Sequence, residues 1–476
     1  MEKYLKYFYE IASIPHGSGN TKMISDYLVK FAQKRELYVR QDEMNNVVIK
    51  KPAHKSYVNC EPIALQGHID MVAVKESDCF KDMKEEGLDL YIDGDYLKAA
   101  GTSLGGDDGI AVAYMLDLLD SDYEMPEIQC IFTVDEEVGM VGATSFNPVD
   151  ITANKMINLD QEKEGEFIVG CAGGATFTFS YVPNKGVYTG SIYEISVSGL
   201  LGGHSGIDIN QNRGCAIKLV TEELCKLSDK IRIQLIDING GTADNVIPND
   251  CVARIMLTDE CDNPLMEKEV MNLNGQDYYF GSLDVPEMAV LNVKKCGSDS
   301  MIALDSESTN KLLKLVSSIP YGVLGMCEAD ESMVETSNNI GRIISGDDDI
   351  KCICMCRSND NRKKDAIVFE LCKLAQSFGA SYEISGSYSG WQYAPVSAFR
   401  DKMVEIYENM YLCKPTVMSI HAGLEGGIFC DKIAGLECVS IGPDINDIHS
   451  VNEALSLSSA QRCFEYVKEV LKQFTE

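Results

Sequence analysis

Helical and strand patterns alternate along roughly the first 180 residues of the chain. EKYLKYFYEIASI and TKMISDYLVKFAQKR space their apolar residues as helices do. NNVVIK, EPIALQG, IQCIFTV and KMINL are short apolar runs rich in β-branched residues, which is typical of buried strands. Strands that alternate with helices predict an α/β fold in which a mixed sheet is flanked by helices.

A second group of segments interrupts this pattern. From about Tyr188, strand-like runs such as YEISVSG and CVARIML surround the helical segment CAIKLVTEELCKL, and a similar stretch follows from MAVLNVKKC to DAIVFELCKLAQSF. After GSYSGWQYAP the first pattern resumes, and it ends with a helix from near Ser458 to Gln473. We therefore predict one α/β domain formed by residues 1–186 and 387–476, interrupted by a large inserted α+β domain at residues 187–386.

The charge balance and the cysteines exclude several classes of protein. The chain has 42 Lys and Arg against 73 Asp and Glu, a net charge of -31, which argues against nucleic acid or an anionic membrane as a partner. The N-terminal segment lacks an apolar signal core, and no run approaches the roughly 18 apolar residues of a membrane span. The 18 cysteines are scattered, often in apolar runs, as reduced core cysteines are. We predict a cytoplasmic protein.

The segment ALQGHID places His68 and Asp70 two residues apart at the end of an apolar run. In a strand, side chains two residues apart point to the same face, so this pair can share one task. A single His-x-Asp is more often a chance surface pair. The other polar residues of the chain must therefore decide between these interpretations.

Acidic residues gather where other strands are expected to end. Glu136 and Glu137 come after IQCIFTV, and Asp160 comes directly after KMINL. Asp107 and Asp108 lie in the glycine-rich turn GTSLGGDDGIA. Ligands of open α/β sheets collect at the carboxyl ends of strands. A helix N-cap also explains the turn, and a solvated loop also explains the paired glutamates. A divalent cation would offset the repulsion between these carboxylates. One carboxylate could then bind the cation while its neighbour acts as a general base.

Ten stretches along the chain carry polar or glycine-rich motifs. They are LQGHIDMV, GTSLGGDDGIA, FTVDEEVGMVGA, INLDQEKEGE, GLLGGHSGIDI, NVIP, CRS, SGW, HAGLEGG and IHSVNE. Taken together and in this order, they resemble the aminoacyl-histidine dipeptidases, the peptidase D branch of the zinc-dependent aminopeptidase and carboxypeptidase G superfamily. The resemblance spans essentially the whole chain.

The resemblance implies a pair of metal ions. It makes His68 and Asp160 ligands of one ion, Glu137 and His449 ligands of the other, and Asp107 the carboxylate that bridges both. Imidazole and carboxylate ligands without thiolate suit Zn2+, with Mn2+ or Co2+ as alternatives.

The resemblance also assigns catalytic and substrate-binding roles. Asp70 would orient His68, and Glu136 would be the general base. His204 in GLLGGHSGIDI would polarise the scissile carbonyl, while Asn245 in NVIP and Arg357 in CRS would hold the peptide carboxylate or the tetrahedral oxyanion. The interrupted α/β domain would be the catalytic domain, and the insertion would be a lid that binds substrate.

Three further positions bear on these assignments. His421 opens the loop HAGLEGG, whose glycines would let a substrate backbone approach, although a flexible turn explains them equally well. Family members commonly have Asn at the position of Asp108, so the extra charge here either raises metal affinity or caps the helix. The segment HSVNE stands where many relatives have HSPDE, which leaves His449 in place.

The resemblance implies a dinuclear metallopeptidase that hydrolyses dipeptides, of the Xaa-His type or with broad specificity. The alternatives within the superfamily are an aminotripeptidase, an N-acyl amino acid hydrolase and a carboxypeptidase. From another class, a catalytically silent metal-binding or peptide-binding protein also fits. A nucleotide-binding protein is disfavoured because neither a dinucleotide fingerprint nor a P-loop occurs. The expected partners are a small peptide and, by analogy with relatives, a second copy in a homodimer.

Overall fold

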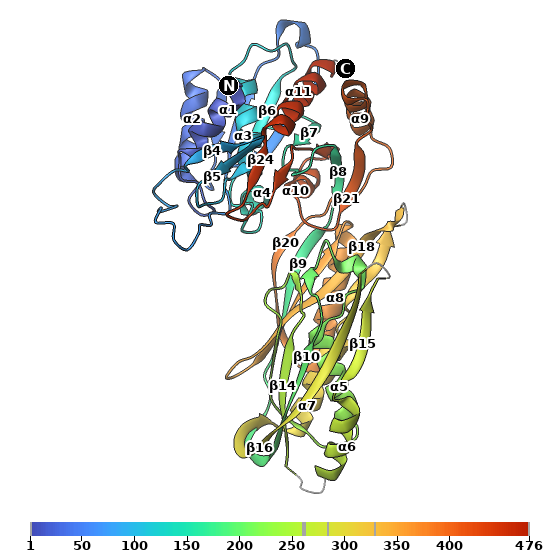
Figure 1. Ribbon diagram of the computed structural model, residues 1–476. Coiled ribbons are helices and arrows are strands. Elements are labelled where there is room, and N and C mark those ends of the chain that lie inside the picture. Colours follow the sequence, from blue (N-terminus) through green and yellow to red (C-terminus); the bar gives the residue numbers. More distant parts are fainter. Residues whose placement is uncertain (1, 259–262, 283–284, 328–329, 475–476) are drawn as a thin grey trace. The chain divides into compact units, whose positions relative to one another are not determined.

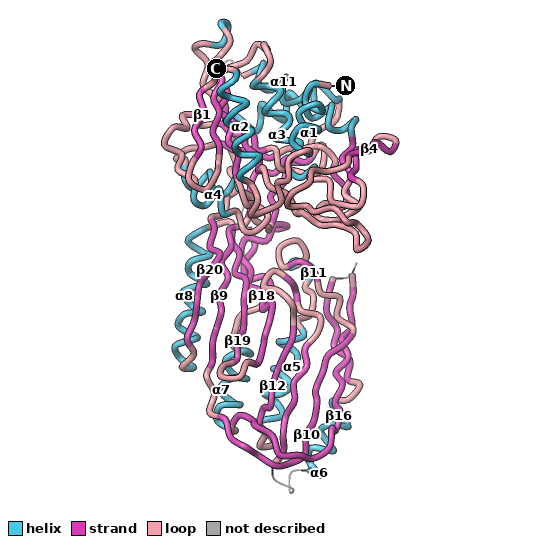
Figure 2. Tube along the Cα trace, turned by 90° about the vertical axis from the view of Figure 1, so that its left-hand side faces the viewer, coloured by secondary structure: helices cyan, strands magenta, loops and turns pink. Residues whose placement is uncertain are grey.

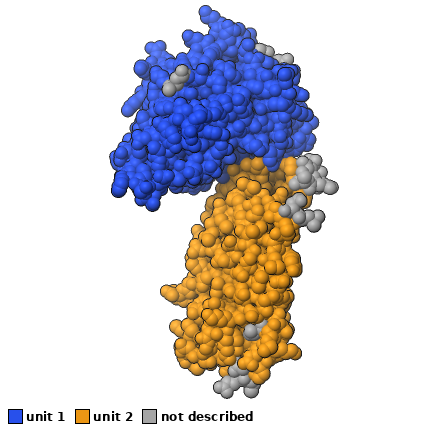
Figure 3. Space-filling model, viewed as in Figure 1, with its two compact units in different colours: residues 1–171, 391–419, 424–476 blue, residues 172–390, 420–423 orange. Residues whose placement is uncertain are grey.

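The computed structural model describes residues 2–258, 263–282, 285–327 and 330–474. They form two compact units (Figure 3). Unit 1 consists of residues 1–171, 391–419 and 424–476, and unit 2 consists of residues 172–390 and 420–423. The predicted insertion, residues 187–386, falls within unit 2.

Unit 1 is built on a mixed sheet of eight strands (Figure 1). Strands β6, β3, β7 and β22 pair in parallel in this order. The pairs β1 with β2, β2 with β6 and β22 with β8 are antiparallel. The spatial order is β1 (Tyr38–Gln41), β2 (Val47–Lys51), β6 (Ile128–Thr133), β3 (Ile63–His68), β7 (Lys155–Asn158), β22 (Glu437–Ser440), β8 (Glu166–Cys171) and β21 (Thr416–Ile420).

Helices cover this sheet. Every residue of β3 and β6 is buried, as expected for central strands with both faces covered. The helix α3 is buried along its whole length and packs against α1 and β3. The predicted α/β class, a mixed sheet flanked by helices, is therefore confirmed. The helices are α1 (Lys3–Ala12), α2 (Lys22–Lys34), η1 (Lys55–Tyr57), α3 (Gly106–Leu119), α4 (Val141–Ser145), α9 (Ala398–Tyr411), α10 (Glu425–Lys432) and α11 (Leu457–Gln473).

A small sheet of four strands completes unit 1. Its strands β23 and β24 pair antiparallel and flank the segment that carries His449. The order is β23 (Ile445–Asn446), β24 (Ala454–Ser456), β5 (Tyr96–Ala99) and β4 (Leu90–Asp93).

Unit 2 contains a sheet of ten strands (Figure 2). Its order is β15 (Gln276–Gly281), β16 (Pro286–Leu304), β10 (Lys185–Ser198), β14 (Cys251–Leu257), β12 (Gln234–Gly240), β18 (Asp330–Ser345), β19 (Ile350–Ser358), β9 (Gly173–Tyr181) and β20 (Ser381–Tyr388), and β17 (Gly322–Cys327) pairs with β18. The short strands β11 (Gly203–His204) and β13 (Val246–Ile247) pair separately.

Helices pack on one face of this sheet. Helix α5 contacts β10 and β14, α7 contacts β12, and α8 contacts β9 and β19. One apolar core lies between these helices and the strands, and it includes Ile195, Leu219, Leu312 and Leu371. The helices are η2 (Ile209–Gln211), α5 (Ala216–Ser228), α6 (Asn263–Leu273), α7 (Ser306–Ser318) and α8 (Asn361–Phe378). Among the described residues of the whole chain, no helix has the length and apolarity needed to cross a membrane.

Candidate metal centre

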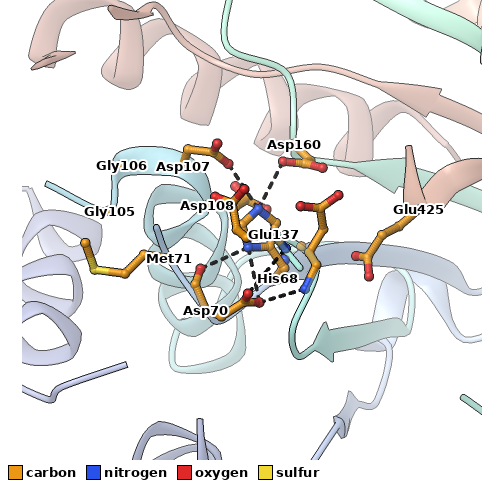
Figure 4. Close-up of polar contacts among 12 residues, drawn as sticks. His68, Asp70, Met71, Gly105, Gly106, Asp107, Asp108, Glu137, Asp160 and Glu425 are labelled. Carbon is orange, nitrogen blue, oxygen red and sulfur yellow. Dashed lines mark hydrogen bonds and ion pairs between the residues drawn. The ribbon is translucent and has the colours of Figure 1, made fainter. Parts of the chain in front are cut away.

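The ends of three parallel strands supply a cluster of polar side chains in unit 1 (Figure 4). His68 is the last residue of β3, Glu136 and Glu137 follow β6, and Asp160 follows β7. Parallel strands have their carboxyl ends at the same edge of a sheet, so these side chains converge there. Asp107 reaches the same place from the first turn of α3.

Asp107 divides the cluster into two halves. His68 Nε2 lies 3.0 Å from Asp107 Oδ1 and 3.4 Å from Asp160 Oδ1. His449 Nε2 lies 3.1 Å from Asp107 Oδ2 and 2.9 Å from Glu137 Oε2. Each oxygen of Asp107 therefore faces one pair made of an imidazole and a carboxylate. The five side chains that the sequence predicted as metal ligands come together in this way.

The donor atoms of the cluster are of the kinds that divalent cations bind. The second carboxylate oxygen of Glu137, Oε1, is buried without a hydrogen-bond partner. Ligand atoms of His68, Asp107 and Glu137 lie within 4.8 Å of one another, as do those of His68, Asp108 and Asp160. Nitrogen and oxygen donors at this spacing are those that Zn2+ and similar ions use.

The backbone of Asp70 orients the His68 ring. His68 Nδ1 lies 3.0 Å from the Asp70 carbonyl oxygen and 3.6 Å from its carboxylate oxygen Oδ1. A carbonyl oxygen only accepts, so Nδ1 carries the proton and Nε2 is left to face the acids. The side chain was expected to do this orienting, but the carbonyl oxygen of the same residue is closer.

The Asp70 carboxylate has a further set of partners. It accepts hydrogen bonds from the backbone N–H of Glu136 at 3.1 Å and of Glu137 at 3.4 Å. The Ser18 hydroxyl donates to it at 2.9 Å. Asp70 therefore holds the backbone of the expected base and of one expected ligand, a role that the spacing of His68 and Asp70 did not indicate.

The crowded charges shift the pKa values in the cluster. Burial raises the pKa of Asp160 to about 6 and that of Glu136 well above its ordinary value. Hydrogen bonds with Asp107 and Glu137 raise the pKa of His449 to about 10. Burial opposes ionisation of Asp107, but hydrogen bonds from His449 and His68 hold its pKa below the ordinary value. Positive charge at the imidazoles compensates the acids, and a bound cation supplies the same compensation.

The Asp108 side chain is directed toward β3. Its Oδ2 accepts a hydrogen bond from the His68 backbone N–H at 3.2 Å. Asp107 and Asp108 lie in the first turn of α3, where their backbone angles are non-helical, and the Asp108 carboxylate bonds to the backbone of β3. A Cβ atom on Gly67 would lie 2.4 Å from Asp108 Oδ2, so only glycine lets α3 approach β3 this closely. Burial raises the pKa of Asp108 well above its ordinary value.

Glu425 is a buried carboxyl group that the motif HAGLEGG did not reveal. Its Oε2 accepts hydrogen bonds of 2.6 Å from Gln66 Nε2 and from the Thr133 hydroxyl, while Oε1 is buried without a partner. Figure 4 shows its side chain directed toward the cluster. Burial raises its pKa to about 8. The glycines that follow belong to α10, and Gly426 packs against Trp391, whose Cζ3 would be 3.3 Å from an added Cβ.

The predicted substrate-binding residues gather in unit 2. The Ser205 N–H, next to His204, donates to the Asn245 carbonyl oxygen at 2.8 Å. Gly206 brings the His204 and His421 segments together, since an added Cβ would lie 3.0 Å from His204 Cε1 and 2.5 Å from the His421 carbonyl oxygen.

Arg357 adds a positive charge to this group. Its Nη1 donates to the Tyr388 hydroxyl at 2.9 Å, while its Nε is buried without a partner. Burial, with Arg357 as the second cause, lowers the pKa of His204 and brings that of His421 to about 3. His421 Nε2 lies 2.7 Å from the Ser337 hydroxyl oxygen. Two neutral imidazoles beside a guanidinium form a site that suits a carboxylate or an oxyanion.

An open pocket of about 760 Å³ lies beside the polar cluster in unit 1. Its walls are mainly apolar, with Met71, Val72, Met83 and Val138 among them. Glu137, one of the predicted metal ligands, also lines it. The pocket therefore continues from one half of the cluster.

Comparison with known proteins gives consistent results. A sequence profile of the peptidase family M20/M25/M40 matches residues 64–473. The cytosol non-specific dipeptidase of Escherichia coli is 33% identical over 469 residues, which is 98% of this chain and 96% of that protein. The crystal structure of aminoacylhistidine dipeptidase from Vibrio alginolyticus superposes with a TM-score of 0.87 at 30% identity, covering 99% of this chain and 96% of that one. The aminopeptidase PepT of Bacillus cereus shares the fold, with a TM-score of 0.57 at 16% identity over 100% of this chain and 98% of its own.

Proposed function

The chain belongs to the M20/M25/M40 peptidase family, and from this membership we propose that it is a dinuclear metallopeptidase that hydrolyses dipeptides. The observation that carries the proposal is the position of Asp107, which directs one carboxylate oxygen toward each pair of imidazole and carboxylate. The names of the relatives from Escherichia coli and Vibrio alginolyticus, both dipeptidases, support this substrate class.

We propose that His68 and Asp160 hold one cation, that Glu137 and His449 hold the other, and that Asp107 bridges them. Zn2+ is the ion that suits this donor set best, with Mn2+ or Co2+ as alternatives. When bound, the cations polarise the peptide carbonyl and make water acidic enough to be deprotonated near neutral pH.

Glu136 is the proposed general base. It takes a proton from the attacking water and gives it to the leaving amine. Burial raises the pKa of Glu136, which makes its carboxylate a stronger base than one in water. Asp70 fixes the Glu136 backbone through the hydrogen bond to its N–H, and so keeps the base in place.

Four residues of unit 2 are the proposed substrate contacts. His204 donates a hydrogen bond to the scissile carbonyl, and Asn245 and Arg357 hold the peptide carboxylate or the oxyanion. His421 completes this group, and its low pKa keeps it neutral in the presence of Arg357. Unit 2 thereby serves as the substrate-binding domain.

The proposed location is the cytoplasm, and the proposed assembly is a homodimer. The name of the Escherichia coli relative, which calls it cytosolic, supports the location. The homodimer follows from the family resemblance.

Hydrolysis of three substrate classes tests the activity. We expect the purified protein to cleave free dipeptides faster than tripeptides or N-acyl amino acids, because the similar proteins from Escherichia coli and Vibrio alginolyticus are both named dipeptidases. A chelator should abolish the activity, and Zn2+ should restore it. Faster cleavage of tripeptides or of N-acyl amino acids would favour the other activities of the superfamily. A dipeptide that binds in the presence of Zn2+ or Mn2+ but stays intact would favour a silent binding protein.

We propose that the pocket beside Glu137 receives a side chain of the dipeptide. Met83 is a partly exposed wall of this pocket, so Met83→Glu places a charge where an apolar side chain would lie. We expect kcat/KM to fall roughly 10-fold for one of the two dipeptides Leu-Gly and Gly-Leu, compared with kcat/KM for Gly-Gly. Met23→Glu, the same change at an exposed position of α2, is the control. It should leave the kcat/KM values for the three dipeptides unchanged relative to one another. An equal loss for all three dipeptides would show that the pocket does not select side chains.

A further inference from the structure

Four consecutive backbone N–H groups, from Leu104 to Asp107, point to the carboxylate of Glu453. Glu453 Oε2 accepts from Leu104 at 2.8 Å and from Gly105 at 3.0 Å. Its Oε1 accepts from Gly106 at 2.7 Å and from Asp107 at 3.3 Å. Glu453 is only 4% exposed, so these bonds form away from water. A buried carboxylate with both oxygens satisfied by four donors holds this turn firmly.

This carboxylate holds the backbone turn that leads into α3, in which Asp107 and Asp108 have non-helical backbone angles. The first N–H groups of a helix lack partners within the helix, and a negative charge there is favourable. The N-cap position is Gly105, which has φ 66° and no side chain to act as a cap. A Cβ atom at Gly105 would also lie 2.8 Å from Met71 Sδ. The turn therefore depends on Glu453, a residue that is distant in the sequence, to bind its N–H groups.

Glu453 lies on the same loop as His449. The strands β23 and β24 pair on either side of this loop, and the Glu453 N–H donates to the Ser450 carbonyl oxygen at 3.3 Å. Glu453 thus joins the loop of His449 to the backbone of Asp107. His449 Nε2 in turn lies 3.1 Å from Asp107 Oδ2.

The other half of the cluster is held differently. His68 is part of β3 and pairs with Thr133 of β6. Asp160 is fixed by its neighbour, because the Leu159 N–H donates to the Gln66 carbonyl oxygen at 2.9 Å. These positions are set by the central sheet.

We infer that Glu453 is a positioning residue that sets the separation between Asp107 and His449 and so supports one half of the cluster more strongly than the other. This inference rests on the proposed dinuclear site. Loss of Glu453 frees the turn and the loop from each other, which weakens the cation site formed by Asp107, Glu137 and His449. The site formed by Asp107, His68 and Asp160 keeps two ligands that the sheet holds.

Titration of the metal-free protein with Zn2+ or Co2+ tests the inference. In Glu453→Ala we expect one ion to bind roughly 10–100-fold more weakly, as is typical when a group that orients ligands is removed, and the other ion to be affected less. Formate should restore the weaker site, because it can occupy the space left by the carboxylate. Glu453→Gln should also weaken that site, since an amide offers one acceptor oxygen in place of two. Near-UV circular dichroism verifies folding, and Glu453→Gln takes the place of Glu453→Ala if the smaller residue prevents folding.

Two double variants show which of the two cation sites Glu453→Ala weakens. Glu453→Ala should add little to His449→Ala, which already lacks one site, and should keep its full effect in His68→Ala. Glu287→Gln is the control for metal binding, because Glu287 is also buried and accepts a backbone N–H, that of Leu201, but lies in unit 2.

Equal weakening of both ions, unchanged affinity for both, or no response to formate would overturn the inference. Wild-type protein that binds fewer than two ions would instead overturn the dinuclear site.

Discussion

Glu136→Gln and Glu136→Ala are expected to bind metal normally and to lose nearly all turnover. General-base catalysis typically contributes about 10²–10⁴-fold, so kcat should fall by roughly this factor. The proposed ligands do not include Glu136, and its backbone N–H still donates to Asp70 in either variant. Metal content from elemental analysis, together with kcat on a dipeptide, checks both parts of the prediction.

Asp135→Asn is the matched control for this experiment. It removes one charge from the adjacent residue, whose carboxylate accepts a hydrogen bond from the Gly19 N–H at 2.7 Å. We expect this variant to keep most of its activity. If a Glu136 variant with metal bound hydrolyses dipeptides at the wild-type rate, Glu136 is not the base.

Asp107→Ala should lose both cations and with them all measurable activity. Its two oxygens face different pairs of ligands, so one substitution removes a ligand from each half. Glu137→Ala and Asp160→Ala each remove a ligand from one half alone, and each should retain one ion. The number of ions per chain after dialysis distinguishes these results.

Asp108→Asn is the control for Asp107→Ala. It lies in the same turn, and an asparagine there can still accept the hydrogen bond from the His68 N–H through its side-chain oxygen. We expect two ions and normal activity. An Asp107→Ala protein that keeps one tightly bound ion would show that Asp107 does not bridge the two halves.

The sequence predicted the α/β class and the family because both depend on local patterns. The apolar periodicity of EKYLKYFYEIASI and the buried runs IALQG and IQCIFTV correspond to α1, β3 and β6. Strand β9 was not predicted, although burial alternates along most of its segment GGATFTFSY. It pairs with β19 and β20, which only the tertiary fold brings beside it.

The details of the cluster depend on contacts between distant segments. Dispersed motifs identified the family and suggested ligands, since each motif keeps its residue types in order. Nothing in the segment HSVNE indicates that Glu453 holds the turn that leads into α3, because the partner N–H groups lie some 350 residues earlier. The same holds for Glu425, whose partners Gln66 and Thr133 come from β3 and β6. Such contacts follow from how remote chain segments pack.

The position of β22 in the sheet has a consequence for synthesis of the chain on the ribosome. This strand pairs with β7 on one side and with β8 on the other, yet it follows both of them in the chain by more than 260 residues. At translation rates of roughly 5–20 residues per second, β7 waits about 15 to 55 seconds for its neighbour. During this time it presents an unpaired edge, a template for association with other chains or a target for chaperones. We therefore expect a nascent chain to complete this sheet, and to bring His449 to Asp107, only after both segments have left the ribosome.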